Sequence, residues 1–175
     1  MFHGEGKDML KQMLKDIKVV QAGEFILASG KKSNYFVNIK RASTDPKVLR
    51  EIGREMAKHV GDAQKIAGMA LGAVPLAVAV ALETDKPFVM VRKEPKDHGT
   101  KELVEGDVAP GERFVIVEDV ATTGGSTLRV VSALRGKGAQ VSRAIVVVDR
   151  EEGATAALKE HGIELISIFR AKDLV

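Results

Sequence analysis

The stretch that decides the fold lies past the middle of the chain and reads Phe114-Val115-Ile116-Val117-Glu118-Asp119-Val120-Ala121-Thr122-Thr123-Gly124-Gly125-Ser126-Thr127. Its apolar first part is typical of a strand buried on both faces. Two carboxylates end that strand, and a loop of hydroxylated residues and glycines leads into a helix. Free backbone N–H groups at such a helix start favour a phosphate, and glycine lets the backbone approach it closely. The stretch predicts a strand–loop–helix unit with an anion site.

Strand and helix patterns alternate on both sides of this stretch. Strands are predicted at 35–39, 65–70, 87–92, 113–119, 141–149 and 164–169. Helices are predicted at 7–20, at 44–60, from Pro75 onward, after the central loop to about Gly136, and at 151–161. The alternation predicts an α/β fold, a Rossmann-like parallel sheet flanked by helices. A ligand of such a sheet lies at the carboxyl ends of its strands.

The length and composition narrow the class of protein. The 175 residues are enough for a single domain, and the net charge of +3 does not indicate a nucleic-acid partner. The absence of cysteine excludes disulfides, thiol nucleophiles and zinc–thiolate sites. The uncharged stretch 66–82 is short and broken by glycine and proline, and the amino terminus lacks the apolar run of a signal peptide. We expect a cytoplasmic protein that binds neither nucleic acid nor membrane.

The acids Glu118 and Asp119 need a role of their own, because carboxylates repel a phosphate. Adjacent acids suit ribose hydroxyls, or the water around a Mg²⁺ ion that the ligand holds. Together with the anion site they point to a sugar phosphate as ligand. The alternative is a solvated acid pair followed by an ordinary turn. A Walker loop is excluded, because the sequence contains no GxxxxGK[ST].

Two further segments carry charge at predicted strand ends. The segment 92–99, Arg-Lys-Glu-Pro-Lys-Asp-His-Gly, holds four potential cations, which suit the negative charge that grows on a leaving pyrophosphate. A mobile loop there could also exclude water from the reaction. In the segment 149–153, Arg150 suits a carboxylate as a planar two-pronged partner. The alternatives are a solvated loop and an ordinary ion pair with Glu151 or Glu152.

These motifs together resemble those of the type I phosphoribosyltransferases, and among them the orotate phosphoribosyltransferases. The central stretch resembles the signature for phosphoribosyl pyrophosphate (PRPP), and 92–99 resembles the catalytic loop. Residues 149–153 resemble the orotate-binding stretch, and 25–38 resemble the pattern FxLxSGxxSxYxxN. The resemblance implies the type I phosphoribosyltransferase fold with a small N-terminal hood, as one domain over 1–175. Residues 1–40 with the C-terminal strand would form the base-binding hood, and 41–160 the core.

The resemblance also implies an activity and a set of residues. The activity is transfer of the phosphoribosyl group from PRPP to orotate, which gives orotidine 5′-monophosphate and pyrophosphate in pyrimidine synthesis. The catalytic residues would be Lys96, His98 and Asp119. PRPP would be bound by Arg92, Lys93, Lys96, His98, Glu118, Asp119, Ala121, Thr122, Thr123, Gly124, Gly125, Ser126 and Thr127. Orotate would be bound by Ser29, Phe36, Thr122 and Arg150. Mg²⁺ would be held mainly by PRPP, and a homodimer would share the catalytic loop between subunits.

The sequence departs from the pattern at three positions. Glu118 stands where many members have aspartate, which keeps the charge, while Ala28 and Gly72 stand where many have lysine. Lys93 and Lys96 are then expected to carry more of the charge neutralisation. Two alternatives remain, a purine-type phosphoribosyltransferase and a PRPP-binding regulator that binds nucleic acid. The segment 92–99 and Arg150 weigh against the first, and the small net charge weighs against the second.

Overall fold

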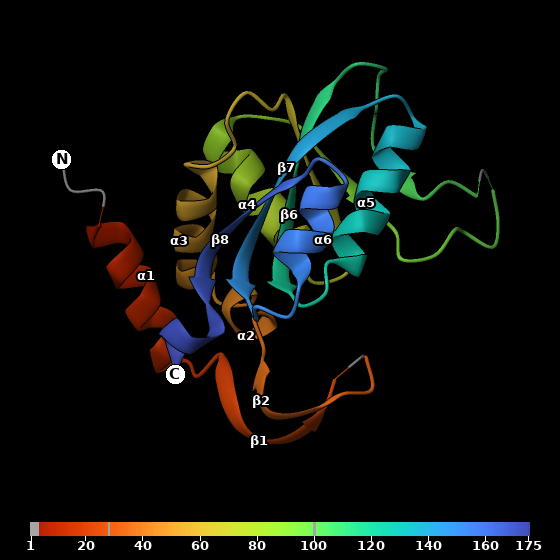
Figure 1. Cartoon of the computed structure of the whole chain (residues 1–175). Helices are drawn as coiled ribbons and strands as arrows, with labels where there is room; N and C mark the ends of the chain where they lie inside the picture. Colours follow the sequence, from red (N-terminus) through yellow and green to blue (C-terminus); the bar gives the residue numbers. More distant parts are fainter. Residues whose placement is uncertain (1–3, 28, 100) are drawn as a thin grey trace.

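The structure is a computed structural model that describes residues 4–27, 29–99 and 101–175. A six-stranded sheet in the order β5-β4-β3-β6-β7-β8 forms its centre (Figure 1). Five strands are parallel: β3 (Lys65–Met69), β4 (Phe88–Val91), β6 (Arg113–Ala121), β7 (Gln140–Asp149) and β8 (Glu164–Arg170). The short β5 (Val104–Glu105) runs antiparallel at the edge. The predicted parallel α/β sheet is confirmed.

Helices cover both faces of the sheet (Figure 1). On one face α1 (Glu5–Asp16), α3 (Pro46–Ala57) and α4 (Val74–Thr84) bury their apolar sides in one cluster. On the other face α5 (Gly125–Gly136) and α6 (Ala154–Glu160) form a second cluster. No helix in the part of the chain that the structure describes is long and apolar enough to cross a bilayer.

Local sequence signals explain where α3 begins. At the start of α3 the Asp45 carboxylate accepts hydrogen bonds from the backbone N–H groups of Lys47 (2.9 Å) and Val48 (3.2 Å). Pro46 follows at the first helical position, where a missing N–H costs nothing. The helix therefore begins where the sequence predicts, although it ends at Ala57 and not near residue 60.

A two-stranded antiparallel hairpin, β1 (Val20–Ile26) with β2 (Lys32–Val37), stands apart from the main sheet. The short helix α2 (Lys40–Ser43) connects it to the core. The sequence predicts the second strand, although at 35–39, but not the first. Much of β1 is exposed, so its residues carry no continuous or alternating apolar pattern.

The C-terminal strand differs from the expectation that it joins the hood. β8 pairs with β7 in the core sheet, with Ile145 opposite Ile166 and Val148 opposite Phe169. Its apolar side chains fit a covered parallel sheet better than a partly exposed hairpin. The residues after it form the 3₁₀ helix η1 (Ala171–Leu174), whose Leu174 is buried in the same cluster as Leu10 and Leu14 of α1.

The strand order places a switch point between β3 and β6. From β3 the chain crosses to β4 on one side, and β6 then pairs with the other side of β3. Four connections start together at the carboxyl ends of the parallel strands, and their described residues are 70–73, 92–99 with 101–103, 122–124 and 150–153. The hairpin lies near this edge, below the ends of β6 and β7 in Figure 1. A ligand site is expected at such an edge.

Candidate active site

The acid pair closes β6 at the switch point. Glu118 is buried, and its Oε1 accepts a hydrogen bond from the backbone N–H of Asp119 (3.1 Å). Its Oε2 is buried without a hydrogen-bond partner among the described residues. Asp119 is half-buried, and its Oδ1 accepts from the backbone N–H of Val120 (2.9 Å). The pair thus offers an unused oxygen to a ligand hydroxyl, which is the kind of group that would satisfy a buried acceptor.

Burial raises the pKa of Glu118 well above its usual range, and the neighbouring Asp119 carboxylate raises this pKa further. The positive charge of Lys40 acts in the opposite direction on the same pKa. Glu118 is therefore held in an environment that disfavours a second negative charge beside Asp119. A perturbed carboxyl in a strand-end site is a common property of functional positions.

Lys40 and Gly72 also meet Asp119. The Nζ of Lys40 lies 3.6 Å from Asp119 Oδ2. A Cβ on Gly72 would lie only 2.5 Å from that same oxygen, so the turn that contains Gly72 passes directly over the carboxylate. Any larger residue at position 72 would displace Asp119.

The loop after β6 has the form expected of a phosphate cradle. Gly124 is the N-cap of α5 with φ 90°, a left-handed conformation that favours glycine. A Cβ there would also lie 3.4 Å from the Cα of Ala154. Thr123, Gly125 and Ser126 are exposed at the helix start, Thr122 is half-buried, and Thr127 is buried. The backbone N–H groups at the start of α5 therefore belong to a polar turn that a ligand can reach.

The segments 92–99 and 101–103 project from the sheet and are called the arm here (Figure 1). Arg92 Nε donates to Glu105 Oε1 (2.9 Å), and the Lys96 ammonium pairs with the same oxygen. These two hydrogen bonds lower the pKa of Glu105 below its usual value. Lys93 and His98 are exposed. In this conformation the arm binds Glu105, and within the described residues no ion pair joins the arm to the acid pair.

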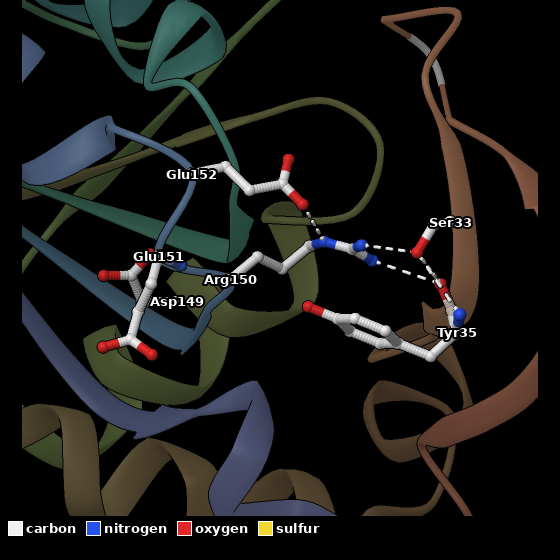
Figure 2. A network of polar contacts seen from close by, with 6 residues as sticks. All are labelled: Ser33, Tyr35, Asp149, Arg150, Glu151 and Glu152. Carbon is white, nitrogen blue, oxygen red and sulfur yellow. Dashed lines mark hydrogen bonds and ion pairs between the residues drawn. The ribbon is translucent and has the colours of Figure 1, made fainter.

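Arg150 is the centre of a network between the core and the hairpin (Figure 2). Its backbone N–H donates to Ala121 O (3.0 Å), which places it beside the end of β6. Its Nε donates to Glu152 Oε1 (2.9 Å) and its Nη2 to Ser33 Oγ (2.9 Å). Its Nη1 donates to Tyr35 O at 3.5 Å, and its guanidinium carbon lies 4.1 Å from the Tyr35 ring centroid.

The guanidinium is thus buried and fixed from three sides, by a carboxylate, the hairpin and an aromatic face. A guanidinium has five N–H donors, so two remain for a ligand. The sequence predicts Arg150 either as a carboxylate-binding residue or as the partner of Glu151 or Glu152 in an ion pair, and the ion pair with Glu152 is present. It assigns no contact with Arg150 to Ser33 or Tyr35, which lie more than a hundred residues away and meet Arg150 only in the folded chain.

The other residues predicted for orotate lie on the hairpin and its turn. Ser29 is exposed in the turn, and Ala28 lies outside the described residues. The Phe36 ring is partly exposed and lies 5.5 Å from the Phe25 ring, centroid to centroid. In β2 the side chain of Phe36 points to the face opposite that of Tyr35. The aromatic side chain that contacts Arg150 is therefore Tyr35.

The chemistry of the strand-end donors fits Mg²⁺. The two carboxylates of the acid pair are hard oxygen donors, and Mg²⁺ is commonly held by one or two carboxylates plus substrate phosphates. No cluster of three or more His, Asp or Glu side chains suited to a metal ion occurs in the ranges 4–27, 29–99 and 101–175. The acid pair could therefore contribute to a site that a phosphate ligand completes.

Comparison with known proteins agrees with this geometry. Residues 41–166 match the phosphoribosyl transferase domain family. The orotate phosphoribosyltransferase of Methanocaldococcus jannaschii is 47% identical over 96% of each chain. That of Natronomonas pharaonis is 53% identical over 93% of each chain. The structure of the Mycobacterium tuberculosis orotate phosphoribosyltransferase in complex with PRPP has a TM-score of 0.79 and 31% identity, and the match covers 97% of this chain and 98% of that one.

The predicted resemblance is confirmed by these matches, which extend well beyond the motifs that suggested it. The acid pair, the glycine-capped helix and Arg150 all lie in the matched region, at one edge of the sheet. This chain belongs to the orotate phosphoribosyltransferase family of the type I phosphoribosyltransferases.

Proposed function

We propose that this chain transfers the phosphoribosyl group of PRPP to orotate and releases pyrophosphate. The observation that carries the proposal is that Arg150 donates its backbone N–H to Ala121, the residue directly before the loop 122–124. A carboxylate-binding side chain thus lies next to an acid pair and a phosphate cradle. Orotate carries a carboxylate and PRPP a 5-phosphate, so one edge of the sheet suits both substrates.

The acid pair and the cradle would hold PRPP. The unpartnered Oε2 of Glu118 and the accessible carboxylate of Asp119 suit the two ribose hydroxyls. The loop 122–127 would receive the 5-phosphate through backbone N–H groups and hydroxyls, as helix starts do. Mg²⁺ would supply positive charge to the pyrophosphate oxygens, with Asp119 facing the ion or its water.

Catalysis would need no covalent nucleophile. The bond from ribose C1 to the pyrophosphate oxygen breaks, its electron pair leaves with pyrophosphate, and the ring nitrogen of orotate forms the new bond to C1 and gives up its proton. Orientation of the two substrates and neutralisation of the leaving group supply the acceleration. Neutralisation of the leaving group is assigned to four residues of the arm, Arg92, Lys93, Lys96 and His98. The proposed catalytic residues are Lys96, His98 and Asp119.

To bind pyrophosphate, Arg92 and Lys96 of the arm would have to release Glu105. Glu105 pairs with both Arg92 and Lys96, and such exposed ion pairs contribute little to stability. A pyrophosphate carries more negative charge than one carboxylate, so it is expected to compete well for these cations. The loop could serve its own site or that of the second subunit of a homodimer. We propose a homodimer in the cytoplasm, and light scattering on the purified protein tests its mass.

The assay that tests the function follows the ultraviolet absorbance of orotate with PRPP and Mg²⁺. Loss of orotate absorbance together with release of pyrophosphate is expected. Adenine, hypoxanthine and guanine serve as matched controls, because these bases have no carboxylate for Arg150. Turnover of a purine base without turnover of orotate would contradict the assignment.

A further inference from the structure

Lys40 lies where three segments meet at the switch point. It is the first residue of α2, directly after the hairpin. Its Nζ lies 3.6 Å from Asp119 Oδ2, at the end of β6. A Cβ on Gly72, in the turn after β3, would lie 3.4 Å from the same Nζ. The ammonium therefore occupies the space between the ends of β3 and β6.

Three other cations at this edge already have partners in this structure, while Lys93 is exposed on the arm. Arg92 and Lys96 pair with Glu105, and Arg150 with Glu152. The turn 71–73, Leu-Gly-Ala, contains no cationic side chain. Positive charge next to Asp119 thus comes from Lys40, the one cation that forms an ion pair with it among the described residues.

The ion pair with Asp119 leaves most of the hydrogen-bonding capacity of the Lys40 ammonium unused. The distance to Asp119 is longer than a hydrogen bond, and the side chain is 60% exposed. An ammonium has three N–H donors, so most of its donor capacity is open. A group held next to a substrate acid by a long ion pair, with its donors free, is suited to a second anion.

The position of Lys40 indicates which anion. The loop 122–127, the proposed 5-phosphate cradle, follows Asp119 along the chain toward α5, whereas Lys40 contacts the side of Asp119 that faces the turn at Gly72. With the 5-phosphate in the cradle and the ribose hydroxyls on the acid pair, the remaining anionic group of PRPP is its pyrophosphate.

We propose that Lys40 binds the pyrophosphate of PRPP and stabilises the negative charge that develops on it as the C1–O bond breaks. The inference rests on the proposed function, because it takes PRPP as the ligand. Asp119 attracts the ammonium to the end of β6 through an ion pair of 3.6 Å, and Gly72 leaves the space that the two side chains share. The turn after β3 thereby obtains, from α2, a cation that it does not itself contain.

The test compares Lys40→Ala and Lys40→Arg with the wild-type protein. Lys40→Ala is expected to raise both KM for PRPP and the inhibition constant of pyrophosphate by about tenfold or more, as loss of a charged hydrogen bond does. KM for orotate is expected to change by less than about twofold, because orotate binds at Arg150. Lys40→Arg should recover most of the affinity. Lys47→Ala is the matched control, an exposed lysine in the first turn of α3.

Two results would overturn the proposal. One is an unchanged pyrophosphate inhibition constant in Lys40→Ala. The other is an equal loss of affinity for orotate and PRPP together with a lower melting temperature, which would show that Lys40 only balances the acid pair. Calorimetric titration of each variant with Mg²⁺ and pyrophosphate gives the affinity without turnover. If the wild-type protein failed to consume orotate, this titration would still decide the role of Lys40.

Discussion

Glu118 lies in an environment that is unfavourable to its charged form. A buried carboxyl with one oxygen unpartnered costs free energy, and a second carboxylate follows it directly. Such a cost is typical of positions kept for a ligand and not for stability. The unpartnered oxygen of Glu118, which costs stability, therefore supports the proposal that this residue binds a ribose hydroxyl.

Glu118→Gln is expected to stabilise the protein in a pH-dependent way. The folded pKa is raised above the unfolded value of about 4.5. The native carboxyl thus keeps a proton that the unfolded chain releases, and stability falls as the pH rises from about 4.5 through the raised pKa. Glutamine stays neutral and avoids this loss. Its advantage in melting temperature, about 2–4 °C for each kcal/mol in a domain of this size, should grow with pH.

Thermal unfolding of both proteins between pH 4.5 and 8 measures this effect. A difference in melting temperature that is the same at every pH would contradict the raised pKa. Turnover measured in parallel is expected to fall in the variant, since above the raised pKa it replaces a carboxylate acceptor for a ribose hydroxyl with a neutral amide.

Arg150→Ala is expected to raise KM for orotate at least about tenfold and KM for PRPP much less. The guanidinium is the proposed partner of the orotate carboxylate, whereas the cradle that binds PRPP keeps its own groups. Steady-state kinetics with each substrate varied in turn measures the split. Arg143→Ala is a control, because Arg143 lies near the start of β7 and pairs with Glu164, whereas Arg150 follows the carboxyl end of β7. Equal rises in both KM values would contradict a carboxylate contact.

At the scale of elements, the sequence predicts what local signals determine. The apolar run before Glu118 and the Asp45-Pro46 start of α3 each specify their element within a few residues. β1 and β5 are missed, because one is largely exposed and the other has two residues. The order of the strands also depends on contacts between distant segments. No pattern in the sequence states it, although the resemblance implies it.

The same limit applies to the site. Motif spacing singles out the acid pair, the loop 122–127, the segment 92–99 and Arg150, because each motif is contiguous, and the roles assigned to them stay predictions. Lys40 is missed because its role depends on the meeting of α2, β6 and the turn at Gly72. The one available signal is a lysine directly after a predicted strand end. Glu105 is missed for a similar reason, since the loop folds back to place it beside Lys96.

Lys96 lies on the arm between β4 and β5. Lys96→Ala is expected to lower kcat by at least about tenfold while the melting temperature changes little, because an exposed ion pair contributes little to stability. Lys101→Ala is the matched control, since it removes the same charge from the same exposed segment. Stopped assays at saturating substrates measure kcat. A Lys96→Ala variant with near-normal kcat would contradict the role of this lysine in the reaction.

At the scale of the whole molecule, Arg150 connects the hairpin to the core. Ser33 Oγ accepts a hydrogen bond from the guanidinium and also donates to Tyr35 O (2.7 Å), so the Arg150 side chain connects β2 to the end of β7 (Figure 2). The position of the hairpin and the orientation of the proposed orotate ligand are therefore set by the same group. Substrate affinity and hairpin stability should change together.

Ser33→Ala is expected to speed amide hydrogen exchange in residues 20–37 and to raise KM for orotate several-fold. The variant removes a hydrogen bond to a charged group, which contributes about 1.5–3 kcal/mol. Exchange mass spectrometry of the hairpin peptides measures the first effect and steady-state kinetics the second. Ser142→Ala, an exposed serine of β7, is the control. Unchanged exchange in the hairpin would show that other contacts hold it.

The two-residue strand β5 limits how far the arm can reach. Arg92 N–H donates to Leu103 O (2.7 Å) and Met90 pairs with Glu105, so both ends of the arm are fastened to one point of the sheet. Lys96 is four residues from Arg92, and its Cα therefore cannot lie farther than about 14 Å from that anchor. The attachment of the arm therefore sets the largest distance that Lys96 can reach from the sheet. In a homodimer that shares this arm, the pyrophosphate bound to the second copy must lie within that distance plus one lysine side chain, which restricts how two copies can dock.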